Sequence, residues 1–310
     1  MSTEPEASTG PPVSSTQPGP PGPGDEPAVA AARDAPAAPL DADDNRGRHL
    51  SALLRHPVTL SLGATLAIAA FVGLTIAAGA AVGTAGAGAA VLLVFLIAFV
   101  VASGKAKEDF FSAYASARGL TRSGTTRLPP ATPLLRKGDK RYAEQVMNGT
   151  LPGGYPGALG LYTYEVETRD SDGDRDTDHY RFTVVMHDIP AIAHHVSDVL
   201  CQRRSGFRFM DSTEDVFRRM QRLELESESH DRRYEVFYGA GDDGVWMKRL
   251  FSPSFIVWLS ERAPKDFAFE LSAGALCVNV KGHKKSAAEL DALCEAAAVV
   301  AHRLAEEAAE

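Results

Sequence analysis

The densest group of imidazole and carboxylate side chains in this sequence lies between positions 187 and 198: His187, Asp188, His194, His195 and Asp198. Imidazole titrates near neutral pH, so such a group could act as a general acid or base. His194 and Asp198 are four residues apart and would share one face of a helix. His187, Asp188, His194 and His195 are therefore the catalytic set of one hypothesis, an enzyme acting on a membrane-proximal substrate. The alternative is that they are surface histidines.

A second group of polar residues, with the sequence Gly-His-Lys-Lys-Ser, precedes the C-terminal helix. The free amides and the dipole of a helix N-terminus favour anions. His283, Lys284, Lys285 and Ser286 therefore form a predicted anion-binding site, suited to a phosphate or an anionic lipid headgroup. The segment lacks the earlier glycine of a phosphate-binding loop, and a solvated basic loop is the alternative.

Five aspartates alternate with other residues from Asp170 to Asp178. Calcium prefers several oxygen ligands, but the glycine position does not fit an EF-hand and no glutamate closes the loop. The same residues are ordinary turn formers at a hairpin tip. The sequence also lacks the nucleophile elbow Gly-x-Ser-x-Gly. We therefore predict no metal and no cofactor, and the sequence names no reaction.

Composition narrows the classes of partner. The chain has 310 residues and a formal net charge of −8, which is not the charge of a nucleic-acid-binding protein. Cys201, Cys277 and Cys294 show neither disulfide nor zinc spacing, so they are predicted to be buried, reduced thiols. This prediction agrees with a cytoplasmic domain.

The elements that would position these groups follow from periodicity. Residues 159–167 and 179–189 alternate as strands around the acidic loop and predict a hairpin. Further strands are expected at 222–226, 233–238, 267–271 and 275–281, and helices at 105–120, 191–203, 213–221 and 252–262. The clearest helix begins at Ser286, where Ser286 and Glu289 form a capping box before an apolar stripe. The predicted class is α+β, with a mainly antiparallel sheet and a long C-terminal helix.

An uncharged stretch of about 45 residues runs from Val58 to Ala102. As one helix it would be about 68 Å long, whereas a bilayer core is about 30 Å thick. Two spans, 58–78 and 82–102, joined by a glycine-rich turn are therefore expected within residues 46–104. This predicts a transmembrane hairpin, and so an integral protein whose partner is the lipid bilayer.

Basic residues flank the uncharged stretch on both sides, and the turn has none. Because cytoplasmic flanks carry the excess of lysine and arginine, both termini are predicted to be cytoplasmic. The expected location is the inner membrane of a bacterium, with multi-pass topology. Residues 1–45 are rich in Pro, Gly and Ala and are predicted to be a disordered tail, whereas residues 105–310 form the cytoplasmic domain.

The sequences LELESESHDRRYEVF, LFSPSFIVWL and FELSAGALCVNVKGHKK resemble uncharacterised bacterial proteins with two membrane spans and a cytoplasmic domain of unknown function. The resemblance covers about residues 160–283 and implies no activity. Our leading hypothesis is a non-enzymatic, membrane-anchored protein whose domain binds a protein partner or the membrane surface. The alternatives are the enzyme and an anion or lipid sensor.

Overall fold

The fold is built on a nine-stranded antiparallel sheet. The computed structural model of the chain describes residues 80–169, 175–204, 220–225 and 233–310, together with positions 68, 69, 72 and 76. The strand order is β1-β2-β3-β4-β9-β8-β5-β7-β6. The strands are β1 (Thr121–Thr126), β2 (Lys140–Thr150), β3 (Pro156–Arg169), β4 (Arg175–Asp188), β5 (Asp198–Arg203), β6 (Met220–Leu223), β7 (Tyr234–Gly239), β8 (Phe267–Ser272) and β9 (Ala275–Lys281).

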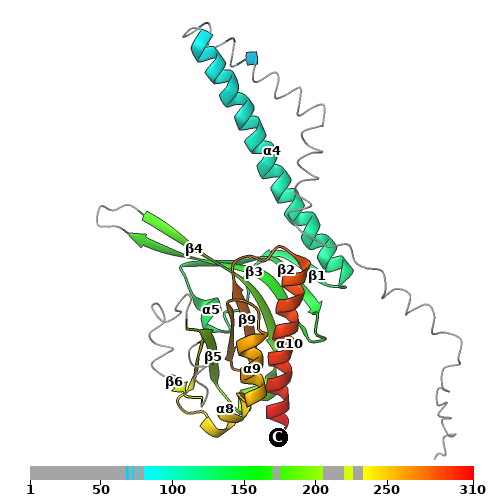
Figure 1. Cartoon of the computed structure of the whole chain (residues 1–310), viewed down its shortest axis with the longest axis vertical. Coiled ribbons are helices and arrows are strands. Elements are labelled where there is room, and N and C mark those ends of the chain that lie inside the picture. Colours follow the sequence, from blue (N-terminus) through cyan, green and yellow to red (C-terminus); the bar gives the residue numbers. More distant parts are fainter. Residues whose placement is uncertain are drawn as a thin grey trace, which may run out of the picture. The chain divides into compact units, whose positions relative to one another are not determined.

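Helices lie against this sheet and extend from it. They are α4 (Ala80–Ala117), the short α5 (Pro133–Arg136), the 3-10 helix η1 (Pro190–His194), α8 (Gly244–Leu250), α9 (Pro253–Glu261) and α10 (Ala287–Ala309). Helix α10 contacts β4, β9, η1 and α8 (Figure 1). The predicted antiparallel sheet and C-terminal helix are present.

The larger core fills the space between the sheet and α10. Alternate residues of the central strands, such as Phe269 and Val278, meet the apolar stripe of α10 that includes Leu293. The helix starts as the sequence predicts, because Ser286 Oγ accepts a hydrogen bond from the Glu289 amide and donates one to Glu289 Oε2. We call this side of the sheet the α10 face.

The opposite side of the sheet is covered over β3, β4 and β9 by a short segment that includes α5. Leu134 and Leu135 pack there against Tyr162, Tyr164 and other strand residues. Tyr164 stacks on Phe182 with ring centroids 5.9 Å apart. We call this side the α5 face.

The transmembrane hairpin is a prediction that the structure overturns. The expected turn lies inside α4, which runs without a break from Ala80 to Ala117. Between Ala80 and Ala90 six alanines, the residue with the strongest helix propensity, accompany three glycines. No helix within the described ranges is long and apolar enough to cross a membrane. The predicted hairpin is wrong, and so are the multi-pass topology and the inner-membrane location that were derived from it.

Two further predictions fall on residues outside the described ranges. These are the tail at 1–45 and nearly all of the first predicted span, 58–78. The helix expected at 213–221 also lies mostly outside them, and its last two residues belong to β6. The prediction for the tail, and for residues 213–219 of that helix, stays untested, whereas the first span falls with the hairpin.

The helix predicted at 191–203 is wrong, because η1 ends at His194 and β5 begins at Asp198. Strand β2 was missed for a different reason. One extra residue is inserted between Glu144 and Met147, and Gln145 there has φ of 53°. Such a bulge shifts the alternation of buried and exposed residues, so the strand has no regular period of two.

Candidate interaction surface

Helix α4 has two halves with opposite surroundings. Between positions 92 and 101, its described large apolar side chains are 42% to 68% exposed: Leu92, Leu93, Leu96, Ile97, Phe99, Val100 and Val101. At about 100° per residue, these positions cover more than half of the circumference. We call residues 92–101 the apolar segment. Exposed apolar patches of this kind mark interaction sites.

The other half of α4, Lys105–Ala117, is packed on the domain. Phe110, Phe111 and Tyr114 are fully buried, and the rings of Phe110 and Phe111 meet edge to face at 4.9 Å. These residues belong to the same core as α10. The packed half therefore anchors α4 on the domain.

A polar clamp joins the end of α4 to α10. The Arg118 guanidinium donates to both carboxylate oxygens of Asp291, with Nε 2.7 Å from Oδ1. Tyr114 donates its hydroxyl to the same Oδ1 at 2.8 Å, and the guanidinium lies 3.9 Å from the centre of its ring. Burial raises the pKa of Tyr114 far above its ordinary value, so this hydroxyl stays a donor.

A second set of contacts joins the packed half of α4 to the first two strands. Lys107 pairs with Glu144 of β2. Glu108 pairs with Arg122 of β1 at 2.8 Å and accepts a hydrogen bond from the bulge residue Gln145 at 3.1 Å. The hydrogen bonds from Gln145 and Arg122 lower the pKa of Glu108. The bulge thus turns one polar side chain toward α4.

The predicted catalytic residues do not converge on one site. His187 is buried, its ring lies 5.8 Å from that of Tyr155, and its Nδ1 is 2.8 Å from the Pro156 carbonyl oxygen. Burial lowers the pKa of His187, although the hydrogen bond with the Pro156 carbonyl and the charge of Asp188 oppose this shift. Asp188 and His194 are exposed. His195 is also exposed and stacks on Trp246, with ring centroids 6.0 Å apart.

The loss of the predicted helix explains part of this separation. His194 ends a 3-10 helix, whereas Asp198 starts a strand and accepts a hydrogen bond from Ser272 Oγ at 2.7 Å. The two residues therefore do not share a helix face. Among the described residues, no group of three or more His, Cys, Asp or Glu side chains could hold a metal ion.

The predicted anion-binding residues are neighbours, but most of their polar groups contact the domain itself. His283 Nε2 is 3.2 Å from both the Tyr162 carbonyl oxygen and the Thr163 hydroxyl. Lys284 donates its amide to Thr183 Oγ1 at 2.8 Å, and its Nζ lies 3.3 Å from Glu289. Ser286 caps α10. Lys285 is exposed. Anion binding here stays a prediction.

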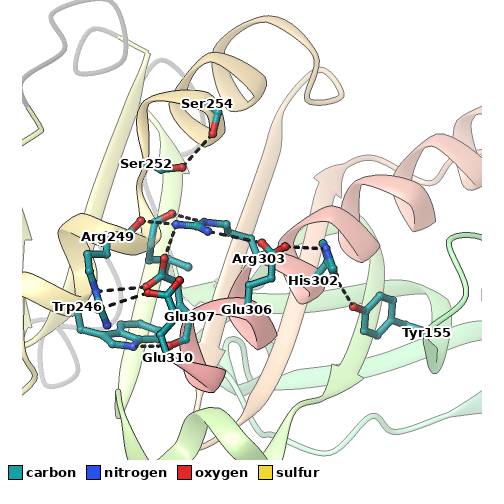
Figure 2. A network of polar contacts seen from close by, with 11 residues as sticks. Tyr155, Trp246, Arg249, Ser252, Ser254, His302, Arg303, Glu306, Glu307 and Glu310 are labelled. Atoms are coloured by element: carbon teal, nitrogen blue, oxygen red, sulfur yellow. Dashed lines mark hydrogen bonds and ion pairs between the residues drawn. The ribbon is translucent and has the colours of Figure 1, made fainter.

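A polar network locks α8 to the last turns of α10 (Figure 2). Arg303 donates to the carbonyl oxygens of Leu250 and Arg249 at 3.2 and 2.6 Å, which satisfies the end of α8. Trp246 Nε1 donates to the Glu307 carbonyl oxygen at 3.3 Å. Arg249 and Arg303 both pair with the buried Glu307 carboxylate. These charges compensate one another, so the network is structural.

A groove of about 520 Å³ opens at the β1 end of the α5 face. Its strand side includes Val146, Ala158 and Met186, and the loop from Thr126 to Ala131 forms another wall. His187 and Asp188 are both among the lining residues, so two of the four predicted catalytic residues border this groove. The sequence did not mark the rest of this groove, because its residues come from four segments.

Comparison with known proteins leaves the chain without an assigned family. No protein-family profile matches the sequence, and no curated protein matches it. One similar solved structure is the mycobacterial trehalose monomycolate transport factor A, TtfA. The two share 8% sequence identity and a TM-score of 0.40, over 64% of this chain and 91% of that one. A likeness at this level assigns neither fold family nor activity.

Proposed function

We propose that this chain is a non-enzymatic binding protein, and that the apolar segment of α4 docks on an apolar helix of a protein partner. The observation that carries this proposal is the exposure of large apolar side chains on seven described residues between positions 92 and 101. Burial of a leucine or valine side chain contributes about 1.5–3 kcal/mol. A partner that covered several of these side chains would gain enough to bind stably.

The chemistry of the segment specifies the occupant. Residues 80–104 contain no charged side chain, so a charged partner surface would lose water without gaining an ion pair. A strand would leave its own backbone groups unpaired against a helix, whereas a helix satisfies its backbone internally. The fitting partner is therefore a helix with an uncharged, apolar face.

The packed half of α4 supports the same proposal. Its buried aromatic residues and the clamp between Arg118 and Asp291 hold the root of the helix on the domain. A preformed, anchored helix loses little conformational entropy when it binds, which favours affinity. The domain would thus present the apolar segment on an anchored helix.

Site-specific photocrosslinking in the cells that make the protein tests this proposal. A photoreactive amino acid would replace Leu96 in the full-length chain, and the matched control would carry it at Ser116. Ser116 is exposed on the same helix, outside the apolar segment. We expect a discrete protein adduct from position 96 and none from position 116.

A second variant connects the adduct to the apolar surface. This variant carries the photoreactive amino acid at position 93 in place of Leu93. It also carries the substitution Val100→Glu, which places a charge within the apolar segment. We expect the adduct to decrease at least about tenfold, because a buried unpaired charge is strongly unfavourable. Equal adducts at positions 96 and 116, or an adduct to lipid or detergent alone, would refute the proposal.

A further inference from the structure

Glu270 is an unusual residue for the middle of a sheet. It lies on the α5 face of β8, paired with Cys277 of β9 and Leu200 of β5, and its side chain is fully buried. Ionised carboxylates are almost never buried without a cation or several hydrogen bonds. Glu270 therefore requires a specific explanation.

The carboxyl group is only half satisfied. Its Oε2 accepts a hydrogen bond from the Leu134 amide at 2.8 Å. Its Oε1 is buried and has no hydrogen-bond partner within the described part of the chain. The Thr132 hydroxyl lies near enough to lower the pKa of Glu270, but no hydrogen bond of acceptable geometry joins the two groups.

The charges and titratable groups around Glu270 come from three elements. Lys137 and Arg136 approach from the α5 side and favour ionisation, and Lys137 is itself 4% exposed. Cys277 approaches from β9, and Tyr162 and Tyr164 from β3. Desolvation outweighs the hydrogen bonds and the two cations, and it raises the pKa of Glu270 from 4.5 to about 7.

The segment held by Glu270 is small. Residues 132–137, which we call the latch, comprise α5 and the residues at its two ends. Besides the bond from the Leu134 amide to Glu270, the latch has two further contacts with the sheet. The Leu134 carbonyl oxygen accepts a hydrogen bond from the Tyr162 hydroxyl at 3.3 Å, and the side chains of Leu134 and Leu135 are buried. The loop that precedes the latch forms a wall of the groove, and Arg136 of the latch donates to the Pro130 and Ala131 carbonyl oxygens of that loop.

We propose that Glu270 is a protonation-controlled latch: its neutral carboxyl group holds residues 132–137 on the sheet, and its ionisation releases that segment together with the adjoining wall of the groove. The ionised group gains water only if the latch lifts. The neutral carboxyl group is buried at much lower free-energy cost and accepts the hydrogen bond that holds Leu134. The state of the groove would therefore follow pH near neutrality.

The direction of the effect follows from linkage. The pKa of Glu270 is higher when the latch is closed, about 7, than its ordinary value of 4.5 in water. The closed state is therefore fully favoured below pH 4.5, and that advantage is lost progressively as pH rises to about 7. Above this range the latch opens most often.

The three cysteines provide an internal readout. Cys277 is the cross-strand neighbour of Glu270 and belongs to the same buried cluster as Leu134 of the latch. Cys201 and Cys294 are buried in the core of the α10 face. Burial raises the pKa of all three thiols, that of Cys294 to about 12, so each reacts only when its surroundings open.

The experiment labels the purified full-length chain with N-ethylmaleimide at pH 6, 7 and 8 and measures each cysteine by mass spectrometry. The rate at Cys277 is divided by the rate at Cys294, which cancels the general effect of pH on thiols. We expect this ratio to rise about tenfold from pH 6 to pH 8, as linkage with the two pKa values requires. A constant ratio would refute the proposal without any variant.

Two variants separate a latch from a general loosening. Glu270→Gln keeps the shape and remains neutral, so its ratio should be independent of pH. Glu307→Gln removes another buried carboxyl group, on α10, and should keep the wild-type rise. If Glu270→Gln retains the pH dependence, or Glu307→Gln abolishes it, another group controls the opening and the proposal is wrong.

Discussion

The two faces of the sheet are closed by very different elements. The α10 face is covered by a 23-residue helix whose buried side includes Leu290, Leu293 and Leu304. The α5 face is covered in part by a four-residue helix that presents Leu134 and Leu135. One cover is long and apolar, whereas the other is short and rests on a buried carboxyl group.

This difference separates stability from responsiveness. A long helix with many apolar contacts cannot lift without exposing a large surface, so it opens only with global unfolding. A short segment exposes little when it lifts, and one ionisable group can then change its position. Elements that move are drawn from the parts of a fold with few buried contacts.

The largest effect is expected on the α10 face. Leu293 is 1% exposed in the centre of the core. Leu293→Ala should lower the free energy of unfolding by about 2–5 kcal/mol, and Leu293→Asp should prevent folding because it buries an unpaired charge. Chemical denaturation followed by circular dichroism measures both. A normally folded Leu293→Asp chain would show that α10 does not close this face.

A matched deletion on the α5 face sharpens the comparison. Leu135 is equally buried, so Leu135→Ala removes the same number of methyl groups as Leu293→Ala. Because the latch can lift alone, we expect a smaller loss of unfolding free energy and a selective increase in maleimide labelling of Cys277. If Leu135→Ala instead accelerates labelling of all three cysteines equally, the two faces open together and the comparison is wrong.

The sequence predicted the α10 face better than the α5 face, for a physical reason. Helix α10 carries its own signals, a capping box at Ser286 and a stripe with a period of 3.6 residues. The hairpin of β3 and β4 also carries its own alternation. Glu270 instead sits in a short apolar strand, and only its pairing with Cys277 and the fold of residues 132–137 over it make it notable.

The uncharged stretch illustrates the opposite error. The hairpin prediction treated residues 79–88 as a turn because of their glycines, but from Ala80 onward the segment is helix and continues into the charged, packed half of α4. The shared helix face expected for His194 and Asp198 depended on a predicted element in the same way. His194 and Asp198 share a face only in a helix, and η1 ends between them. Local spacing fixes a site only if the predicted element forms.

The cap of α10 should have a moderate effect. Ser286 accepts the Glu289 amide and donates to the Glu289 carboxylate. Ser286→Ala should therefore lower the free energy of unfolding by about 1 kcal/mol. Ser286→Asp, which also accepts at this position, is the matched control and should retain most of the stability. If Ser286→Ala is as stable as the wild type, the cap contributes little.

The smallest effect is expected where the sequence predicted anion binding. The side chains of Lys284 and Glu289 are 27% and 48% exposed, and such pairs contribute about 0.2–1 kcal/mol. Lys284→Gln together with Lys285→Gln should therefore change the free energy of unfolding by less than about 1 kcal/mol at neutral pH.

Thermal unfolding of the wild type and of this variant, with and without inorganic phosphate, tests whether the lysines bind an anion. If the lysines serve only the domain, phosphate should shift the melting temperature of both proteins equally. A shift that the variant lacks, and that disappears at high salt, would instead support anion binding at the start of α10, because screening weakens exposed charge interactions.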